Sequence, residues 1–225
     1  MPFVHNAASS LVFSLNRLLH PVVYMHFRVH WVAGVDVLSD HPLVQKAYRR
    51  ARKLHAGQQR KDEVTPFIVH PVRVALILQE AGSVPEVVAA ALLHDTVEDT
   101  SYTPDRLRRD FGEMIHGIVL ACTEDQGIPD WRSRKERLLA QVRGASDEAR
   151  LLKAADVLAN MRNLLDGLRV TNGAFWAKFL GQPEDYLWYY RQVYDIASDI
   201  LPNPMRSDFL QGIQELESAM RVSDL

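Results

Sequence analysis

The stretch VVAAALLHDTVEDT, residues 87–100, decides the fold of this chain. It opens with seven consecutive apolar residues, which predict a central helix that is buried on most of its sides. Where the apolar run ends, an imidazole and a carboxylate stand side by side, His94 and Asp95, and two more carboxylates follow at Glu98 and Asp99. These polar residues form either the solvated end of a helix or one wall of a metal site. The rest of the sequence has to distinguish the two.

The sequence around this stretch predicts helices almost throughout. Apolar residues recur every three or four positions, and Thr103-Pro104, Ser146 and Gly82 are typical helix start and stop signals. No alternating strand pattern, repeat or low-complexity tract is present, so we expect an all-α fold, a single helical bundle over residues 41–225. The expected helices cover 41–55, 70–81, 85–97, 104–111, 113–121, 131–142, 146–168 and 184–200, with a last one after Pro204.

The first forty residues differ from the rest of the chain. They contain no acidic residue before Asp36, and Arg17, His20 and Arg28 interrupt their apolar runs. No stretch therefore reaches the roughly 20 apolar residues that span a bilayer, and a secretory signal fits poorly. We expect residues 1–40 to be an N-terminal appendage of uncertain order. A peripheral amphipathic segment, a packing arm and a leader before a true start at Met25 remain open.

Composition excludes several classes of protein. The 26 basic and 28 acidic residues nearly balance, which gives no electrostatic case for binding nucleic acid or an anionic membrane. The single cysteine, Cys122, cannot form an internal disulfide and fits a reducing compartment, so we expect a cytoplasmic protein without a transmembrane segment. The 47% of apolar residues suffices for a sizeable core. The oligomeric state is not indicated.

Two further residues suggest that His94 and Asp95 belong to a metal site. His70 begins a helix in the run IVHPV, and Asp156 lies inside the apolar helical stretch LLKAADVLANM. Burying an unpaired carboxylate is costly, and a cation removes that cost. Each residue alone has an ordinary explanation, a capped surface histidine or a hydrogen-bonded aspartate. Together, two imidazoles and two carboxylates suit Mn²⁺ or Fe²⁺, with Zn²⁺ possible, and the lack of thiolates excludes a zinc finger.

The order His70, His94-Asp95, Asp156 resembles the HD superfamily of metal-dependent phosphohydrolases. The blocks QQRKDEVTPFIVHPVRVALIL, AALLHDTVEDTSYTPDRLRRDFGEMIHGIV and KAADVLANMRNL look like the hydrolase domain of RelA/SpoT-type (p)ppGpp enzymes. The similarity covers about residues 43–200 and is greatest to the stand-alone small alarmone hydrolases. It implies an all-helical HD domain in which these four side chains hold one Mn²⁺.

The resemblance also implies an activity and further site residues. The activity is hydrolysis of guanosine 3′,5′-bis(diphosphate), ppGpp or pppGpp, at the 3′-diphosphate with release of pyrophosphate, a reaction of the stringent response. Glu98 and Asp99 would orient and deprotonate the attacking water, Glu98 foremost. Arg60 would pack against the guanine base, Lys61 would lie near the phosphates, and Asn160 would hydrogen-bond the nucleotide. Lys153 and Arg162 are weaker candidates for phosphate binding.

Two departures from the family pattern concern the substrate. Val157 stands where the family usually has a basic residue, and the segment DEVTP lacks the glycine that tends to follow RKD. A phosphohydrolase acting on a dNTP, a nucleoside monophosphate or NADPH therefore remains an alternative. So does a module that senses guanine nucleotides without catalysis. In the run YLWYYRQVY we expect core packing, although Tyr186 or Tyr190 could border the pocket.

Overall fold

The computed structural model describes residues 38–60, 65–171, 176 and 182–223. The chain divides into two units, residues 1–38 and 39–225, and the fold described below is that of the second. The appendage expected over residues 1–40 therefore lies almost entirely outside the described residues. Lys61 also lies outside them.

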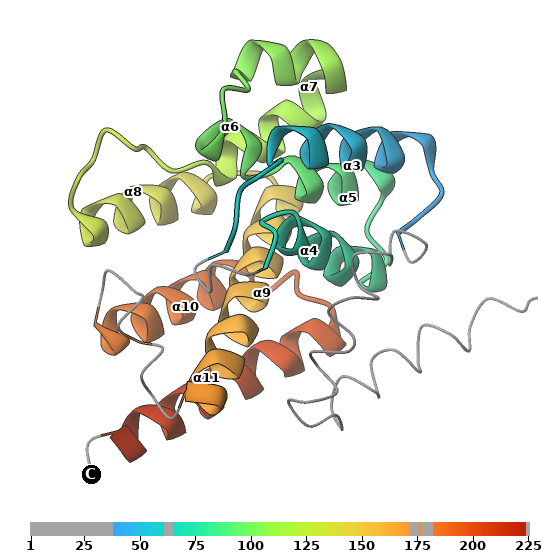
Figure 1. The fold of residues 1–225 in the computed structure, drawn as a ribbon. Helices are drawn as coiled ribbons and strands as arrows, with labels where there is room; N and C mark the ends of the chain where they lie inside the picture. The colour runs from blue at the N-terminus through green and yellow to red at the C-terminus, as the bar shows by residue number, and fades with distance from the viewer. Residues whose placement is uncertain (1–37, 61–64, 172–175, 177–181, 224–225) are drawn as a thin grey trace, which may run out of the picture. The chain divides into compact units, whose positions relative to one another are not determined.

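The second unit consists of helices (Figure 1). Among the described residues there is no strand, only an isolated bridge between Gln59 and Pro66. The prediction of an all-α fold is confirmed. The helices are α3 (Pro42–Leu54), α4 (Val69–Glu80), α5 (Pro85–Leu93), α6 (Thr96–Asp99), α7 (Pro104–Cys122), α8 (Trp131–Arg143), α9 (Asp147–Thr171), α10 (Pro183–Ala197) and α11 (Asn203–Ser223).

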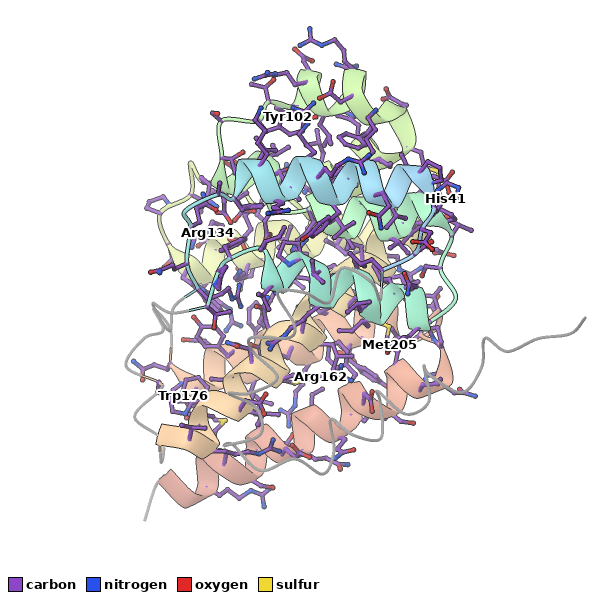
Figure 2. All side chains as sticks on the ribbon, turned by 45° about the vertical axis from the view of Figure 1, so that its right-hand side comes forward. His41, Tyr102, Arg134, Arg162, Trp176 and Met205 are labelled. Carbon is purple, nitrogen blue, oxygen red and sulfur yellow. The ribbon has the colours of Figure 1, made fainter. Side chains whose placement is uncertain are left out.

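Two helices, α5 and α9, form the centre of the bundle. Every residue from 87 to 93 in α5 is at most 2% exposed, because α3, α4, α7 and α9 pack around this helix. The long helix α9 runs obliquely past α4 and α5 and also contacts α10 and α11 (Figure 1). Side chains fill the space between these helices (Figure 2). The apolar run thus lies in the core, as its composition predicts.

The central helix ends earlier than its apolar pattern predicts. The sequence predicts one helix over 85–97, but α5 stops at Leu93 and the four-residue α6 begins at Thr96. The Thr96 hydroxyl donates to the Leu93 carbonyl at 2.6 Å, a side-chain bond that competes with the helical pattern at this point. His94 and Asp95 therefore lie in the turn between the two helices. A turn lets these adjacent side chains face one common point.

Helix α7 bends at Gly112, between the two helices predicted over 104–111 and 113–121. Gly112 has φ 84° and ψ 174°, a backbone conformation that side chains with a Cβ rarely adopt. The first half begins at the predicted cap, where the Thr103 hydroxyl accepts a hydrogen bond from the Arg106 amide at 3.3 Å. The bend therefore confirms the predicted division into two helical segments.

Among the described residues, none of the helices combines the length and the apolar character that crossing a bilayer requires.

Candidate metal centre and active site

Three of the predicted metal ligands converge on one buried point. His70 comes from the first turn of α4, His94 from the end of α5 and Asp156 from the middle of α9. One ligand atom from each of the three lies within 4.8 Å of the others. The Oδ1 atom of Asp156 is 3.1 Å from His70 Nε2 and 3.7 Å from His94 Nε2. Residues 86 positions apart in the chain thus share one polar centre.

Asp95 joins this centre from the turn after α5. Its Oδ1 atom is 3.0 Å from His94 Nε2, and its Oδ2 atom is 3.6 Å from His70 Nε2. Metal–ligand bonds of about 2.1 Å place neighbouring ligand atoms about 3.0 to 3.4 Å apart in octahedral or tetrahedral geometry. The observed separations are close to this range. The structure therefore brings together all four side chains that the sequence singled out.

The surroundings of His94 prepare one ring nitrogen for a ligand role. Its Nδ1 atom donates to the Ala91 carbonyl at 2.7 Å, which fixes the proton on Nδ1 and leaves the lone pair on Nε2. The buried Nε2 atom has no hydrogen-bond partner among the described residues, although a carboxylate oxygen lies 3.0 Å away. A divalent cation would bind both the lone pair of this buried nitrogen and the carboxylate oxygens that face it. The four residues fit a metal ion.

The charged groups in the centre act strongly on one another's pKa values. Burial lowers the pKa of His94, but the carboxylates of Asp95 and Asp156 outweigh burial and raise it to about 10, so Nε2 binds either a proton or, in its place, a cation. Burial raises the pKa of Asp156, but Lys153 and the two neighbouring imidazoles hold it well below its usual range. Burial lowers the pKa of His70 and keeps this imidazole neutral. The carboxylates are thus ionised, and the centre favours positive charge.

The carboxylate of Asp156 is held on both oxygens. Lys153 Nζ donates to Oδ2 at 2.9 Å, and the Asn160 amide donates to Oδ1 at 2.7 Å. The Asn160 carbonyl oxygen in turn accepts from Arg60 at 3.0 Å. This chain of contacts links the loop before α4 to the metal centre, so the predicted substrate residues Arg60 and Asn160 lie at its rim.

The acidic pair lies in α6, directly after the metal centre. Glu98 is anchored by both carboxylate oxygens, because Oε2 accepts from the Glu124 amide at 3.0 Å and Oε1 from Gln126 Nε2 at 2.7 Å. Asp99, the last residue of α6, is exposed. Burial is the main cause that raises the pKa of Glu98. Although Asp99 keeps an exposed surface, partial desolvation of its carboxyl group, with the charges of Asp95 and Glu98, raises its pKa to about 7.

The structure assigns other roles to several weaker candidates. Arg162 donates to Asp208 of α11 at 2.6 Å, and Lys153 is committed to Asp156, so neither is placed as a phosphate ligand. Val157, at the position of the missing basic residue, is 1% exposed and belongs to the core. Tyr186 and Tyr190 are both buried, with ring centroids 6.3 Å apart, in agreement with the expected packing role.

Sequence reasoning missed the polar residues that support the acidic pair. Gln126 and the Glu124 amide come from the loop between α7 and α8, and Gln58 donates to the Asp99 carbonyl at 2.9 Å. Glutamines in polar loops carry no periodicity, so no pattern marked them.

Comparison with known proteins places this centre in a family. The HD domain family model matches residues 47–172. A protein named guanosine-3′,5′-bis(diphosphate) 3′-pyrophosphohydrolase MESH1 from Xenopus tropicalis is 41% identical over 129 residues, which cover 56% of this chain and 72% of the relative. The human protein of that name is 42% identical over 125 residues, covering 54% and 69%. A pyrophosphohydrolase from Aquifex aeolicus is 36% identical over 134 residues, only 19% of its own length.

Two solved structures are similar to this chain in fold. A metazoan orthologue of SpoT, described as hydrolysing ppGpp, superposes with a TM-score of 0.68 at 26% identity, covering 79% of this chain and 97% of the other. A Listeria monocytogenes protein superposes with a TM-score of 0.57 at 31% identity, covering 64% and 96%. Since the family model spans more than half of the sequence and includes all four converging side chains, this chain belongs to the HD domain family.

Proposed function

We propose that this chain hydrolyses guanosine 3′,5′-bis(diphosphate), ppGpp or pppGpp, at the 3′-diphosphate in a manganese-dependent reaction. The observation that carries the proposal is the buried convergence of His70, His94 and Asp156, joined by Asp95, next to an acidic pair. Two relatives named for this reaction are 41% and 42% identical to this chain over more than half of its length. The activity is assigned to the helical domain, residues 41–225.

The reaction needs one water molecule per nucleotide. The water oxygen bonds to the phosphorus attached to O3′, the P–O3′ bond breaks, and O3′ takes up a proton. The products are pyrophosphate and GDP or GTP. The chain must therefore orient the water, accept its proton and bind the negatively charged nucleotide.

The proposed cation ligands are His70, His94, Asp95 and Asp156. Two imidazoles and two carboxylates without a thiolate suit Mn²⁺, and related divalent transition metals are compatible with the same donors. A bound divalent cation supplies a lower pKa for coordinated water and neutralises charge on the phosphoryl oxygens.

The two residues of the acidic pair, Glu98 and Asp99, have separate proposed roles. Glu98, anchored by the loop between α7 and α8, has a fixed carboxylate and orients the water. Asp99 is exposed and its carboxylate accepts the proton. Both groups lie in α6, which starts one residue after the metal-centre residue Asp95.

Substrate contacts are assigned to the rim of the centre. Arg60 lies over the Phe67 ring at 5.6 Å and bonds Asn160, which places its planar guanidinium at the end of a polar loop. A guanidinium in that position can stack on a purine, and Asn160 can hydrogen-bond the nucleotide. Lys61, the next residue, is proposed to approach the phosphates.

A nucleotide panel tests the proposal. The purified protein is stripped with EDTA, reloaded with Mn²⁺ and incubated with ppGpp, pppGpp, dNTPs, nucleoside monophosphates and NADPH, while pyrophosphate and phosphate are detected separately. We expect Mn²⁺-dependent pyrophosphate release from ppGpp and pppGpp. Faster turnover of another nucleotide would assign the chain to a different phosphohydrolase activity. Tight ppGpp binding without pyrophosphate release would make it a sensing module.

A further inference from the structure

Gln58 connects three segments of the site. Its side-chain amide nitrogen donates to the Asp99 carbonyl at 2.9 Å, and its side-chain oxygen lies 2.6 Å from His55 Nδ1. Its backbone carbonyl accepts from the Phe67 amide at 3.0 Å. One residue thus joins the end of α3, the segment leading into the His70 helix, and the helix of the acidic pair.

The groups around Gln58 determine which of its side-chain atoms donates and which accepts a hydrogen bond. The Asp99 carbonyl can only accept, so the Gln58 atom that faces it must be the amide nitrogen. The amide oxygen then faces His55, and His55 must carry its proton on Nδ1. Burial lowers the pKa of His55, which keeps the ring neutral with that one proton. The contacts therefore run in one direction, from His55 through Gln58 to Asp99.

The His55 side chain is buried and packed against Phe67. It is 3% exposed, and its ring stacks on Phe67 with centroids 4.7 Å apart and planes 26° apart. Its other nitrogen, Nε2, is buried and has no hydrogen-bond partner among the described residues. A buried acceptor without a partner costs about 1 to 3 kcal/mol. A phenylalanine would avoid that cost but would offer Gln58 no hydrogen-bond donor.

The helix that receives this contact cannot position itself. α6 has four residues, and isolated helices this short are unstable in water. Asp99 is its last residue, so its carbonyl is one of the groups that have no partner within the helix. Gln58 supplies the partner from a segment 41 positions away. The direction of the Asp99 side chain therefore depends on a contact outside α6.

We propose that Gln58, oriented by His55, is a positioning residue for the acidic pair. It fixes the end of α6 relative to the loop that carries Arg60 and the helix that carries His70. The catalytic part of this inference rests on the proposed function, because it assumes that Asp99 acts on the water. The structural part, the link from His55 through Gln58 to α6, stands independently of any activity.

The test compares Gln58→Met with Gln59→Met. Gln59 is the adjacent residue and is exposed, so it controls for the loss of a glutamine from the same loop. Small displacements of a catalytic group are costly, and we expect Gln58→Met to lower kcat for ppGpp by about ten- to a hundredfold. KM and Mn²⁺ affinity should stay within about twofold, because the substrate and metal contacts are retained. Gln59→Met should match the wild type in all three.

A second variant tests the direction of the contacts. His55→Phe keeps an aromatic ring against Phe67 but removes the donor to Gln58, so we expect a smaller loss of kcat. The double variant His55→Phe/Gln58→Met should be no slower than Gln58→Met alone, since both changes break one chain of contacts. Additive losses would overturn the role given to His55. An unchanged kcat in Gln58→Met, or a loss explained by lower Mn²⁺ affinity, would overturn the proposal.

Hydrogen exchange separates this inference from the proposed function. Peptides covering residues 96–101 should exchange faster in Gln58→Met than in the wild type and in Gln59→Met, because the end of α6 loses its support. This readout needs no substrate. If the wild type fails to hydrolyse ppGpp while the exchange difference is present, the assigned reaction is wrong and the structural link stands. Unchanged exchange would refute the link itself.

Discussion

Lys153 donates a hydrogen bond from Nζ to Oδ2 of Asp156 at 2.9 Å, one turn away in α9. The other oxygen of the same carboxylate, Oδ1, faces His70 Nε2 at 3.1 Å. Both residues are buried, with 5% and 7% of their surface exposed. The lysine thus occupies one carboxylate oxygen and directs the other toward the metal centre.

This relationship predicts how stability depends on metal. Lys153→Met leaves a buried carboxylate without its cation, and breaking a buried pair costs about 3 to 5 kcal/mol of unfolding free energy. A metal ion bound at Oδ1 compensates for the missing charge. We therefore expect a large loss of stability in EDTA and a clearly smaller one in saturating Mn²⁺, measured by urea denaturation. The exposed Lys53→Met is the control, and equal losses of stability with and without Mn²⁺ would contradict the prediction.

The metal ligands should be required for binding as well as turnover. His94→Ala and Asp156→Ala each remove one donor from the buried centre, and we expect both variants to lose bound Mn²⁺ after gel filtration and to release no pyrophosphate from ppGpp. Asp195→Asn, on the exposed face of α10, should retain both. Substantial activity in a variant that holds no metal would exclude the assigned ligand set.

The sequence predicts those parts of the structure that depend on repeated apolar spacing. The helices and the burial of α5 follow from periodicity. The four converging side chains were found as polar residues in or beside apolar helical segments, and the family resemblance supported them. The turn at His94 and Asp95 was not predicted, because the apolar pattern continues to Val97, whereas α5 stops at Leu93, whose carbonyl accepts a hydrogen bond from the Thr96 hydroxyl. An apolar run predicts that a segment is buried, whereas the residue at which a helix ends depends on local hydrogen bonds.

Contacts between distant polar residues could not be predicted in the same way. Arg162 was a candidate for phosphate, yet its guanidinium bonds Asp208, 46 positions later in α11. Its spacing on α9 gives no information about which helix packs beside it. Lys153 is different, because its i,i+3 relation to Asp156 already placed both on one face of a helix. That pair could have been recognised from sequence spacing alone.

The acidic pair should affect chemistry without affecting the metal. Glu98→Gln and Asp99→Asn remove negative charge while conserving shape, so we expect kcat for ppGpp to fall by a factor of about 10² to 10⁴ in each variant. Mn²⁺ content, measured by atomic emission, should remain at wild-type level, because neither side chain is a proposed ligand. A variant with unchanged kcat would remove that residue from the proposed mechanism.

Two arginines provide a matched test of substrate binding. Arg60 bonds Asn160 at the rim of the centre, whereas Arg162 bonds Asp208 at 2.6 Å. If Arg60 binds the base in both the ground state and the transition state, Arg60→Ala should raise KM for ppGpp by about tenfold or more with little change in kcat. Arg162→Ala should leave KM unchanged and lower the thermal midpoint slightly, because a half-exposed ion pair contributes about 1 kcal/mol or less. A higher KM in Arg162→Ala, with a normal value in Arg60→Ala, would move the nucleotide to the other side of α9.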